Sequence, residues 1–114
     1  MDILEFTNVL VDAALDKKGS DLLLLDMQEQ VIFADYFLLV NAENDPQMRA
    51  IINNMIDEAR SVKERPLNVE SSPTGGWNLL DFGAVVVHVF SPEQREYYNL
   101  EELWQDARVV VRMQ

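Results

Sequence analysis

The sequence contains no cysteine and only one histidine, His88. The absence of cysteine excludes a disulfide framework, a cysteine-ligated zinc site and a thiol nucleophile. A single histidine cannot supply a multi-histidine metal site or a two-histidine mechanism within one protomer. We therefore expect no metal site in this chain.

Long apolar runs are also lacking. Runs such as Leu22–Leu25 and Ala84–Val87 have the length of strands, whereas a membrane-spanning helix needs roughly 18 apolar residues. The N-terminal stretch Met1–Glu5 is acidic, unlike a signal peptide or an arginine-rich transit peptide. These features predict a soluble, cytoplasmic protein that makes no contact with a membrane.

Basic residues are scarce as well: nine lysines and arginines stand against 20 aspartates and glutamates, so the net charge is −11. Proteins that bind nucleic acid directly normally use Lys and Arg to displace counterions from phosphates. We therefore expect little direct contact with RNA or DNA, and a protein partner with a basic surface instead. The alternative is that the acidity serves only solubility.

The composition of the chain is that of a folded domain. Hydrophobic residues make up 48% of the 114 residues, far more than in a disordered chain. A chain of this length is too short for two domains with good cores, and no repeat or linker interrupts it. We therefore predict one domain over residues 1–114.

Apolar spacing and capping residues predict the helices. They are residues 3–18 with Gly19 after the last turn, a helix from Asp45 (N-cap) and Pro46 to a boundary at Pro66, a helix that begins at the capping box 91–94, and a second helix start at 99–102. Short segments that carry apolar residues predict the strands. They are residues 22–25, 31–40, 67–70, 77–82 and 84–90, with 109–111 as a short strand or a tail.

The order of these elements is α-β-β-α-β-β-β-α. It predicts an α/β or α+β domain in which helices flank a mixed β-sheet. The run 22–25 has no polar alternation, so we expect it to be covered on both faces. The short connection between 77–82 and 84–90 favours an antiparallel hairpin, and 71–76 is predicted to be a turn.

Gly19-Ser20 ahead of an acid-bearing strand is a weak indication of nucleotidyl transfer. Metal-dependent transfer needs two carboxylates one residue apart, so that both side chains point to one face and bind the same metals. Asp21 and Asp26 are five residues apart, and Asp35 lies beyond a turn. We therefore predict that the chain is not an enzyme and has no catalytic residue.

Phosphate-binding motifs are absent. The sequence has neither a dinucleotide fingerprint nor a phosphate-loop lysine motif. Thr74-Gly75-Gly76 has no basic residue near it and no predicted helix after it, so we interpret it as a turn. We expect no cofactor.

His88 lies inside the predicted strand 84–90, where alternation places it on one face with Val86 and Phe90. Two interpretations stay open. The ring is either a partly buried histidine that is hydrogen-bonded to a neighbour, or part of a binding face. Nothing in the sequence supports a catalytic role or a pH switch.

The C-terminal third combines aromatic and acidic residues. The aromatic residues are Trp77, Tyr97, Tyr98 and Trp104, and the acidic residues are Asp81, Glu93, Glu96, Glu101, Glu102 and Asp106. Trp and Tyr are frequent hot spots of protein interfaces, and the surrounding acids suit a basic partner. The alternative is that Trp104 and one tyrosine are core residues and the acids form a solvated helix face.

Six short motifs follow one another along the chain: Asp21 with Leu25-Asp26, Ala34-Asp35-Tyr36-Phe37, Trp77 with Leu80-Asp81-Phe82-Gly83, Val87-His88-Val89-Phe90, Arg95-Glu96-Tyr97-Tyr98 and Leu100-Glu101-Glu102-Leu103-Trp104. In their order and spacing, from Val9 to about Val109, the chain resembles the Iojap family of ribosomal silencing factors. Each motif is weak alone, whereas the set is quite specific.

The resemblance implies a fold similar to that of nucleotidyltransferases without their catalytic acids. It also implies a homodimer that binds the large ribosomal subunit through its basic ribosomal protein fourteen, keeps the small subunit away and so represses translation. A role in large-subunit assembly is one alternative, and a nucleotide-binding enzyme is another. The partner-binding residues that the resemblance supplies are Trp77, Asp81, His88, Tyr97, Tyr98, Leu100 and Glu101.

The chain departs from the family pattern at two places. It has Asn41-Ala42-Glu43-Asn44 where a glycine and a serine commonly follow the second strand, and Ser71 where a glycine is usual. We expect both places to be loops, so that the fold is unaffected.

Overall fold

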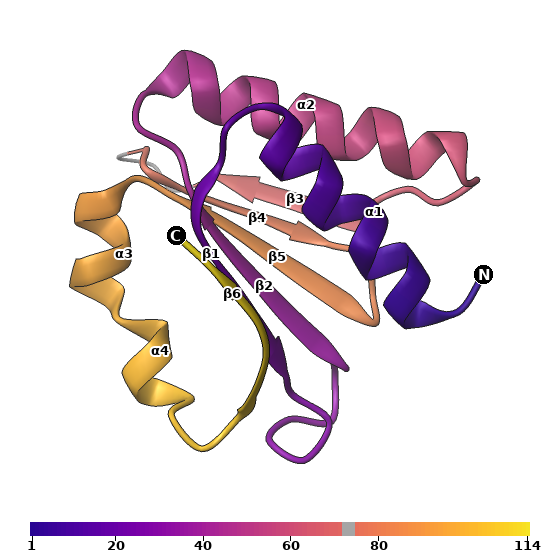
Figure 1. The fold of residues 1–114 in the computed structure, drawn as a ribbon, viewed down its shortest axis with the longest axis vertical. Helices are drawn as coiled ribbons and strands as arrows, with labels where there is room; N and C mark the ends of the chain where they lie inside the picture. The colour runs from indigo at the N-terminus through magenta and orange to yellow at the C-terminus, as the bar shows by residue number, and fades with distance from the viewer. Residues whose placement is uncertain (72–74) are drawn as a thin grey trace.

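The structure is a computed structural model that describes residues 1–71 and 75–114 (Figure 1). Its helices are α1 (Ile3–Asp16), α2 (Asp45–Ser61), α3 (Pro92–Tyr98) and α4 (Leu100–Leu103). Its strands are β1 (Ser20–Asp26), β2 (Tyr36–Asn41), β3 (Asn68–Ser71), β4 (Trp77–Asp81), β5 (Val85–Phe90) and β6 (Arg108–Met113). All six strands join one sheet in the order β3-β4-β5-β2-β1-β6.

The sheet is mixed, as the element order predicts. β2 and β5 are parallel neighbours, and every other pair of neighbouring strands is antiparallel. Parallel strands need a crossover connection. Here that connection contains α2, which packs beside α1.

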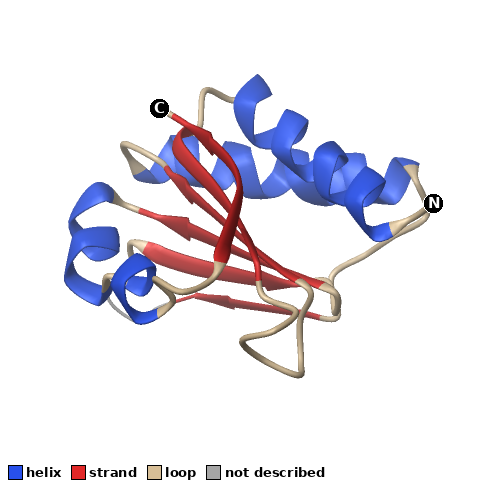
Figure 2. Ribbon diagram, turned by 60° about the horizontal axis from the view of Figure 1, so that its bottom comes forward, coloured by secondary structure: helices blue, strands red, loops and turns tan. Residues whose placement is uncertain are grey.

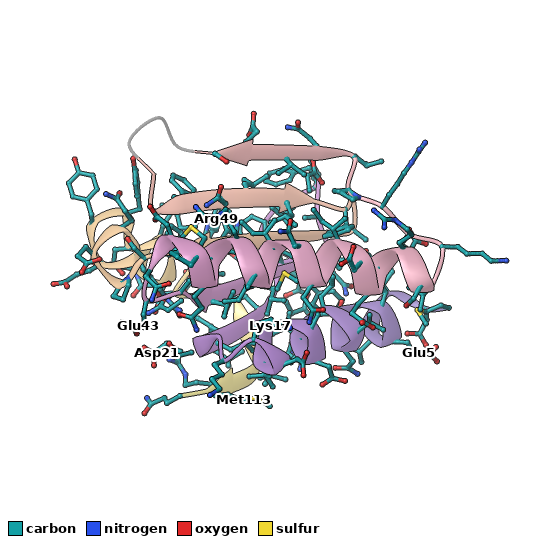
Figure 3. All side chains as sticks on the ribbon, turned by 90° about the horizontal axis from the view of Figure 1, so that it is seen from above. Glu5, Lys17, Asp21, Glu43, Arg49 and Met113 are labelled. Carbon is teal, nitrogen blue, oxygen red and sulfur yellow. The ribbon has the colours of Figure 1, made fainter. Side chains whose placement is uncertain are left out.

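Apolar side chains cover both faces of the sheet. α1 and α2 lie side by side on one face (Figure 3), and α3 and α4 lie on the other side of the sheet (Figure 2). Leu22 and Leu24 of β1 belong to the core beneath α1 and α2. Leu23 and Leu25 belong to a second core on the opposite face. The prediction that this strand is covered on both faces is therefore confirmed.

The end of α1 differs from the prediction in one detail. Lys18, not Gly19, adopts the left-handed conformation after the last turn, with φ of 64°. Gly19 is required for space instead, because a Cβ there would lie 2.7 Å from Cγ2 of Val40 and 3.0 Å from the carbonyl oxygen of Ala14. The glycine lets the chain pass closely between α1 and β2.

α2 begins one residue earlier than its predicted start. Asn44, not Asp45, is the N-cap, and its side chain accepts a hydrogen bond from the backbone N–H of Gln47. An asparagine fills this position as well as an aspartate does. The helix ends at Ser61, well before Pro66, and Lys63 turns the chain with φ of 64°.

β2 begins at Tyr36, so the prediction of a strand from residue 31 was wrong. Residues 27–35 form a loop closed by backbone hydrogen bonds, including one from Val31 N–H to the carbonyl oxygen of Met27. Ile32 is fully exposed and Phe33 is 64% exposed. Within the part of the chain that the structure describes, these apolar residues have no strand beside them to pair with, since the pairing of β2 with β5 starts only at Tyr36.

The remaining predictions concern the strands of the C-terminal half, two expected loops, a turn and the length of the helices. β4 and β5 form the predicted antiparallel hairpin, and residues 109–111 lie in a strand, β6, which pairs with β1. Residues 42–44 lie in the loop before α2, as expected, whereas Asn41 ends β2 and Ser71 ends β3, so the expectation of a loop was wrong at these two residues. The predicted turn over 71–76 falls partly outside the described residues. Within the described ranges, no helix has the length and apolar character needed to cross a bilayer.

Candidate protein-binding surface

The edge of the sheet formed by β3 and β4 presents a partly exposed apolar face. Trp77 and Leu79 alternate along β4 and point to the side of the second core, because their register partners are Phe90 and His88. Glu70 of β3 pairs with Leu79 and so lies on the same face. Trp77 and Leu79 are half-buried, whereas Glu70 is exposed.

A hollow of about 380 Å³ lies on this face. Its lining residues are Glu70, Ser71, Trp77 and Leu79. We call it the β3–β4 hollow. It combines an aromatic ring, an aliphatic side chain and a carboxylate, which together suit a side chain with an apolar stem and a basic end.

Two tyrosines of α3 lie beside the hollow. The rings of Trp77 and Tyr98 have centroids 4.4 Å apart, and Tyr97 meets Tyr98 edge-on at 5.1 Å. Tyr97 is 78% exposed and Tyr98 is 43% exposed. We call Trp77, Tyr97 and Tyr98 the aromatic patch.

The start of α3 explains why these tyrosines reach Trp77. Ser91 follows β5 directly and caps the helix by accepting a hydrogen bond from the N–H of Gln94. The return half of the predicted capping box is not formed, because the N–H of Ser91 donates to the carbonyl oxygen of Gly76. That bond joins the start of α3 to the segment that enters β4. It therefore holds the two parts of the aromatic patch together.

His88 lies beneath Trp77 and is only 4% exposed. Nε1 of Trp77 donates a hydrogen bond to Nδ1 of His88 over 3.2 Å. Burial lowers the pKa of His88 to about 4, so the ring is neutral at physiological pH. The interpretation of a buried, hydrogen-bonded histidine is confirmed.

Arg95 is a buried residue that was not among the predicted site residues and that links several elements at this surface. It is 8% exposed, and its Nε lies 3.0 Å from Oε1 of Glu101. Its Nη1 donates to Oδ1 of Asn41 over 2.9 Å and also to the carbonyl oxygen of Asp21. One arginine thus ties α3 and α4 to the ends of β1 and β2. A sequence signal existed, since Arg95 is the single basic residue in a stretch of acids and aromatics.

The predicted binding residues divide into three groups. Trp77, Tyr97 and Tyr98 come together at the surface, and His88 supports them from below. Leu100 and Glu101 lie on the α3–α4 side, where Leu100 packs on the second core and Glu101 pairs with Arg95.

Asp81 stands apart from these residues. It lies at the opposite end of β4, roughly 13 Å along the strand from Trp77 at about 3.3 Å per residue. Its carboxylate accepts a hydrogen bond from the N–H of Gly83 over 2.8 Å and so stabilises the β4–β5 turn. It shares the sheet face of Trp77.

The two acids of β1 that were considered for nucleotidyl transfer do not lie close enough together to bind one metal ion. Asp21 and Asp26 lie at the two ends of β1. Asp26 accepts hydrogen bonds from the N–H of Gln28 and from Arg108, and the bond from Gln28 is the main cause of its lowered pKa. Over residues 1–71 and 75–114, no group of three or more acidic, histidine or cysteine side chains could hold a metal ion.

The family model for the ribosomal silencing factor during starvation matches residues 1–114. The chain belongs to the ribosomal silencing factor family. The ribosomal silencing factor of Bacillus subtilis is 42% identical over 92 residues, which cover 81% of this chain and 78% of that protein. The resemblance found in the sequence is thereby confirmed.

Two further proteins extend the comparison. A crystal structure of a Chromobacterium violaceum protein is 30% identical, with a TM-score of 0.87 over 92% of this chain and 88% of that one. The mouse protein named mitochondrial assembly of ribosomal large subunit protein 1 is 25% identical over 100 residues. The match covers 85% of this chain and 44% of the mouse protein. The names of the Bacillus and mouse proteins concern ribosomal silencing and assembly of the ribosomal large subunit, respectively.

Proposed function

We propose that this silencing factor binds ribosomal protein fourteen on the large ribosomal subunit and sterically blocks joining of the small subunit. It acts in the cytoplasm by occupying a surface, without catalysis and without a cofactor. The observation that carries the proposal is the aromatic patch, because three large aromatic side chains meet at an exposed edge of a strongly acidic protein.

The aromatic patch has the properties of an interface hot spot. Trp77 is held between the second core and Tyr98, so it is already ordered before a partner arrives. Ordered aromatic rings bury large area at a small entropic cost. Tyr97 and Tyr98 remain exposed at 78% and 43% and present both ring and hydroxyl.

The charge of the surface complements a basic partner. Glu70 borders the β3–β4 hollow, and a Lys or Arg stem lying on Leu79 and Trp77 would bring its charged end to that carboxylate. Asp81 adds a second acidic position farther along the same face. In this proposal His88 supports the surface from inside, while Leu100 and Glu101 hold α4 against the second core and Arg95.

Replacing Trp77 by alanine tests the anchor. We expect Trp77→Ala to weaken binding to isolated large subunits by roughly 30- to 1,000-fold, because loss of a central aromatic anchor commonly costs about 2–4 kcal/mol. Co-sedimentation with purified large subunits measures the affinity. The matched control is Phe33→Ala, which removes an exposed aromatic ring from the 27–35 loop, away from the patch. Equal binding by both variants would contradict the proposal.

Large-subunit assembly is the second candidate, favoured by the name of the mouse relative. The two roles differ in the ribosomal particle on which the protein acts. A silencing factor prevents mature subunits from joining, whereas an assembly factor affects precursor particles and leaves the joining of mature subunits unchanged.

A nucleotide-binding enzyme is the remaining alternative. A folded protein that binds magnesium and a nucleotide gains stability with the logarithm of the ligand concentration over Kd. We expect no change in melting temperature when both are added at millimolar concentration. A rise of several degrees would reopen the enzyme hypothesis.

We also propose that the protein forms a homodimer. The exposed side chains Ile3, Leu4 and Leu15 of α1 and Val109 and Met113 of β6 supply apolar surface for such contact. Light scattering at micromolar concentration should give twice the chain mass. A monomeric mass would contradict this part of the proposal.

A further inference from the structure

Trp77 has one polar atom in its side chain, and the structure directs that atom inward. The indole N–H donates to Nδ1 of His88, and the ring also stacks on Phe90 with centroids 5.3 Å apart. A partner at the β3–β4 hollow therefore meets ring carbons of Trp77. Which edge and face of the ring are offered depends on the hydrogen bond to His88.

We propose that His88 is a positioning residue, whose Nδ1 accepts the indole N–H and fixes the ring of Trp77 in the orientation that the partner binds. The inference rests on the proposed function, because it takes Trp77 as the anchor. It assigns to His88 an indirect role in place of the direct contact that its position in the family motif suggests.

The acceptor itself is held rigidly. His88 lies in the middle of the sheet, with Leu79 of β4 and Leu39 of β2 as register partners on its two sides. The ring of Phe37 lies 4.9 Å from the imidazole and that of Phe90 lies 6.0 Å from it, both between centroids. A support packed on all sides transmits its orientation to the group that it holds.

The other ring nitrogen shows that packing alone does not explain the histidine. A neutral imidazole that accepts at Nδ1 must carry its proton on Nε2. Nε2 is buried, and no atom of residues 1–71 or 75–114 is a hydrogen-bond partner for it. An unpaired buried donor disfavours the folded state, so an apolar ring would serve a merely structural position better. The hydrogen bond that Nδ1 accepts from Trp77 compensates for the unpaired Nε2.

The first test uses the hydrogen bond itself and needs no ribosome. His88 is the one histidine of the chain, so the nitrogen chemical shifts of a single imidazole report its tautomer without assignment. We expect the proton on Nε2, and slow exchange of one of the two indole N–H groups, identified by its loss in Trp77→Phe. A proton on Nδ1, or equally fast exchange of both indole groups, would overturn the proposal.

The second test is a double-mutant cycle on binding to large subunits. His88→Phe keeps an aromatic ring but removes the acceptor, and we expect affinity to fall roughly three- to tenfold, the worth of one hydrogen bond. His88→Asn places an amide oxygen near the position of Nδ1 and should retain most of the affinity. In the Trp77→Phe background, His88→Phe should cause no further loss.

The outcomes separate the two proposals. Additive losses in the cycle would mean that His88 acts independently of Trp77 and would overturn the positioning role. Full binding by Trp77→Phe and Trp77→Ala would overturn the anchor in the proposed function, while the tautomer and the exchange of the indole N–H still report on the hydrogen bond. Circular dichroism and melting curves confirm that each variant is folded, and a variant that does not fold leaves the wild-type spectra as the deciding result.

Discussion

The residue that links most parts of the surface is Arg95. Its guanidinium reaches the end of β1, the end of β2 and Glu101 of α4, while its backbone belongs to α3. A buried arginine that loses its acceptors, or acceptors that lose their arginine, cost more than the bonds themselves contribute. The position of the tyrosines therefore depends on this side chain.

Replacing Arg95 should lower stability more than replacing its partner Glu101. We expect Arg95→Ala to lower the free energy of unfolding by about 3 kcal/mol, because it leaves Asn41, the Asp21 carbonyl and Glu101 without their donor. Glu101→Gln should cost about 1 kcal/mol, since Glu101 is 34% exposed in its side chain. Urea unfolding measures both. Glu96→Gln on the exposed side of α3 is the control, and equal stabilities of all three variants would contradict this account.

His88 gives the protein a defined dependence of stability on pH. Its pKa is about 4 in the folded state and near its ordinary 6.5 in the unfolded chain. Between these values only the unfolded chain binds the proton, so stability is complete above about pH 6.5 and falls as the pH drops toward 4. The loss approaches roughly 3 kcal/mol at the lower end, at 1.36 kcal/mol per pKa unit.

Urea unfolding at several pH values checks this window. His88→Phe should lose the decline between pH 6.5 and 4. The contribution of Asp26, whose folded pKa lies below 3.8, is lost only at lower pH, so the two effects separate. An unchanged decline in His88→Phe would assign it to other groups.

At the scale of elements, most of the fold could be predicted from the sequence. The two-sided burial of β1, the hairpin of β4 and β5 and the starts of α3 and α4 follow from local spacing and capping residues. The loop 27–35 could not be predicted, because Val31-Ile32-Phe33 has the composition of a strand and only its lack of a pairing partner excludes it. Arg95 was missed because two of its three acceptors, Asp21 and Asn41, lie in distant segments of the sequence.

The close packing of α1 on β2 leads to a prediction about Gly19. A Cβ at this position would lie 2.7 Å from Cγ2 of Val40, a side chain that is completely buried. We expect Gly19→Ala to destabilise the protein by about 1–3 kcal/mol through overpacking. In the Val40→Ala background the same change should cost less, because the clashing methyl group is gone. Melting curves of the four proteins test the coupling, and additive losses would show that the crowding lies elsewhere.

At the scale of the whole molecule, the charge of −11 governs how the protein meets its partner. Attraction between exposed charges is screened over about 10 Å at 0.1 M salt. We expect affinity for the large subunit to fall roughly tenfold or more between about 0.05 M and 0.5 M salt. Tyr98→Ala should lower affinity by a factor that does not change with salt concentration, because the ring contact carries no charge. A salt-independent affinity would show that acidity serves solubility alone.

Binding to the large subunit should exclude the small one, and a subunit-joining assay measures this exclusion. Purified large subunits are incubated with increasing amounts of the protein, small subunits are added, and joined particles are separated by sedimentation. We expect joining to decline as the large subunits become occupied, and we expect Trp77→Ala to require a much higher concentration for the same effect. Undiminished joining by large subunits that carry the bound protein would contradict this expectation.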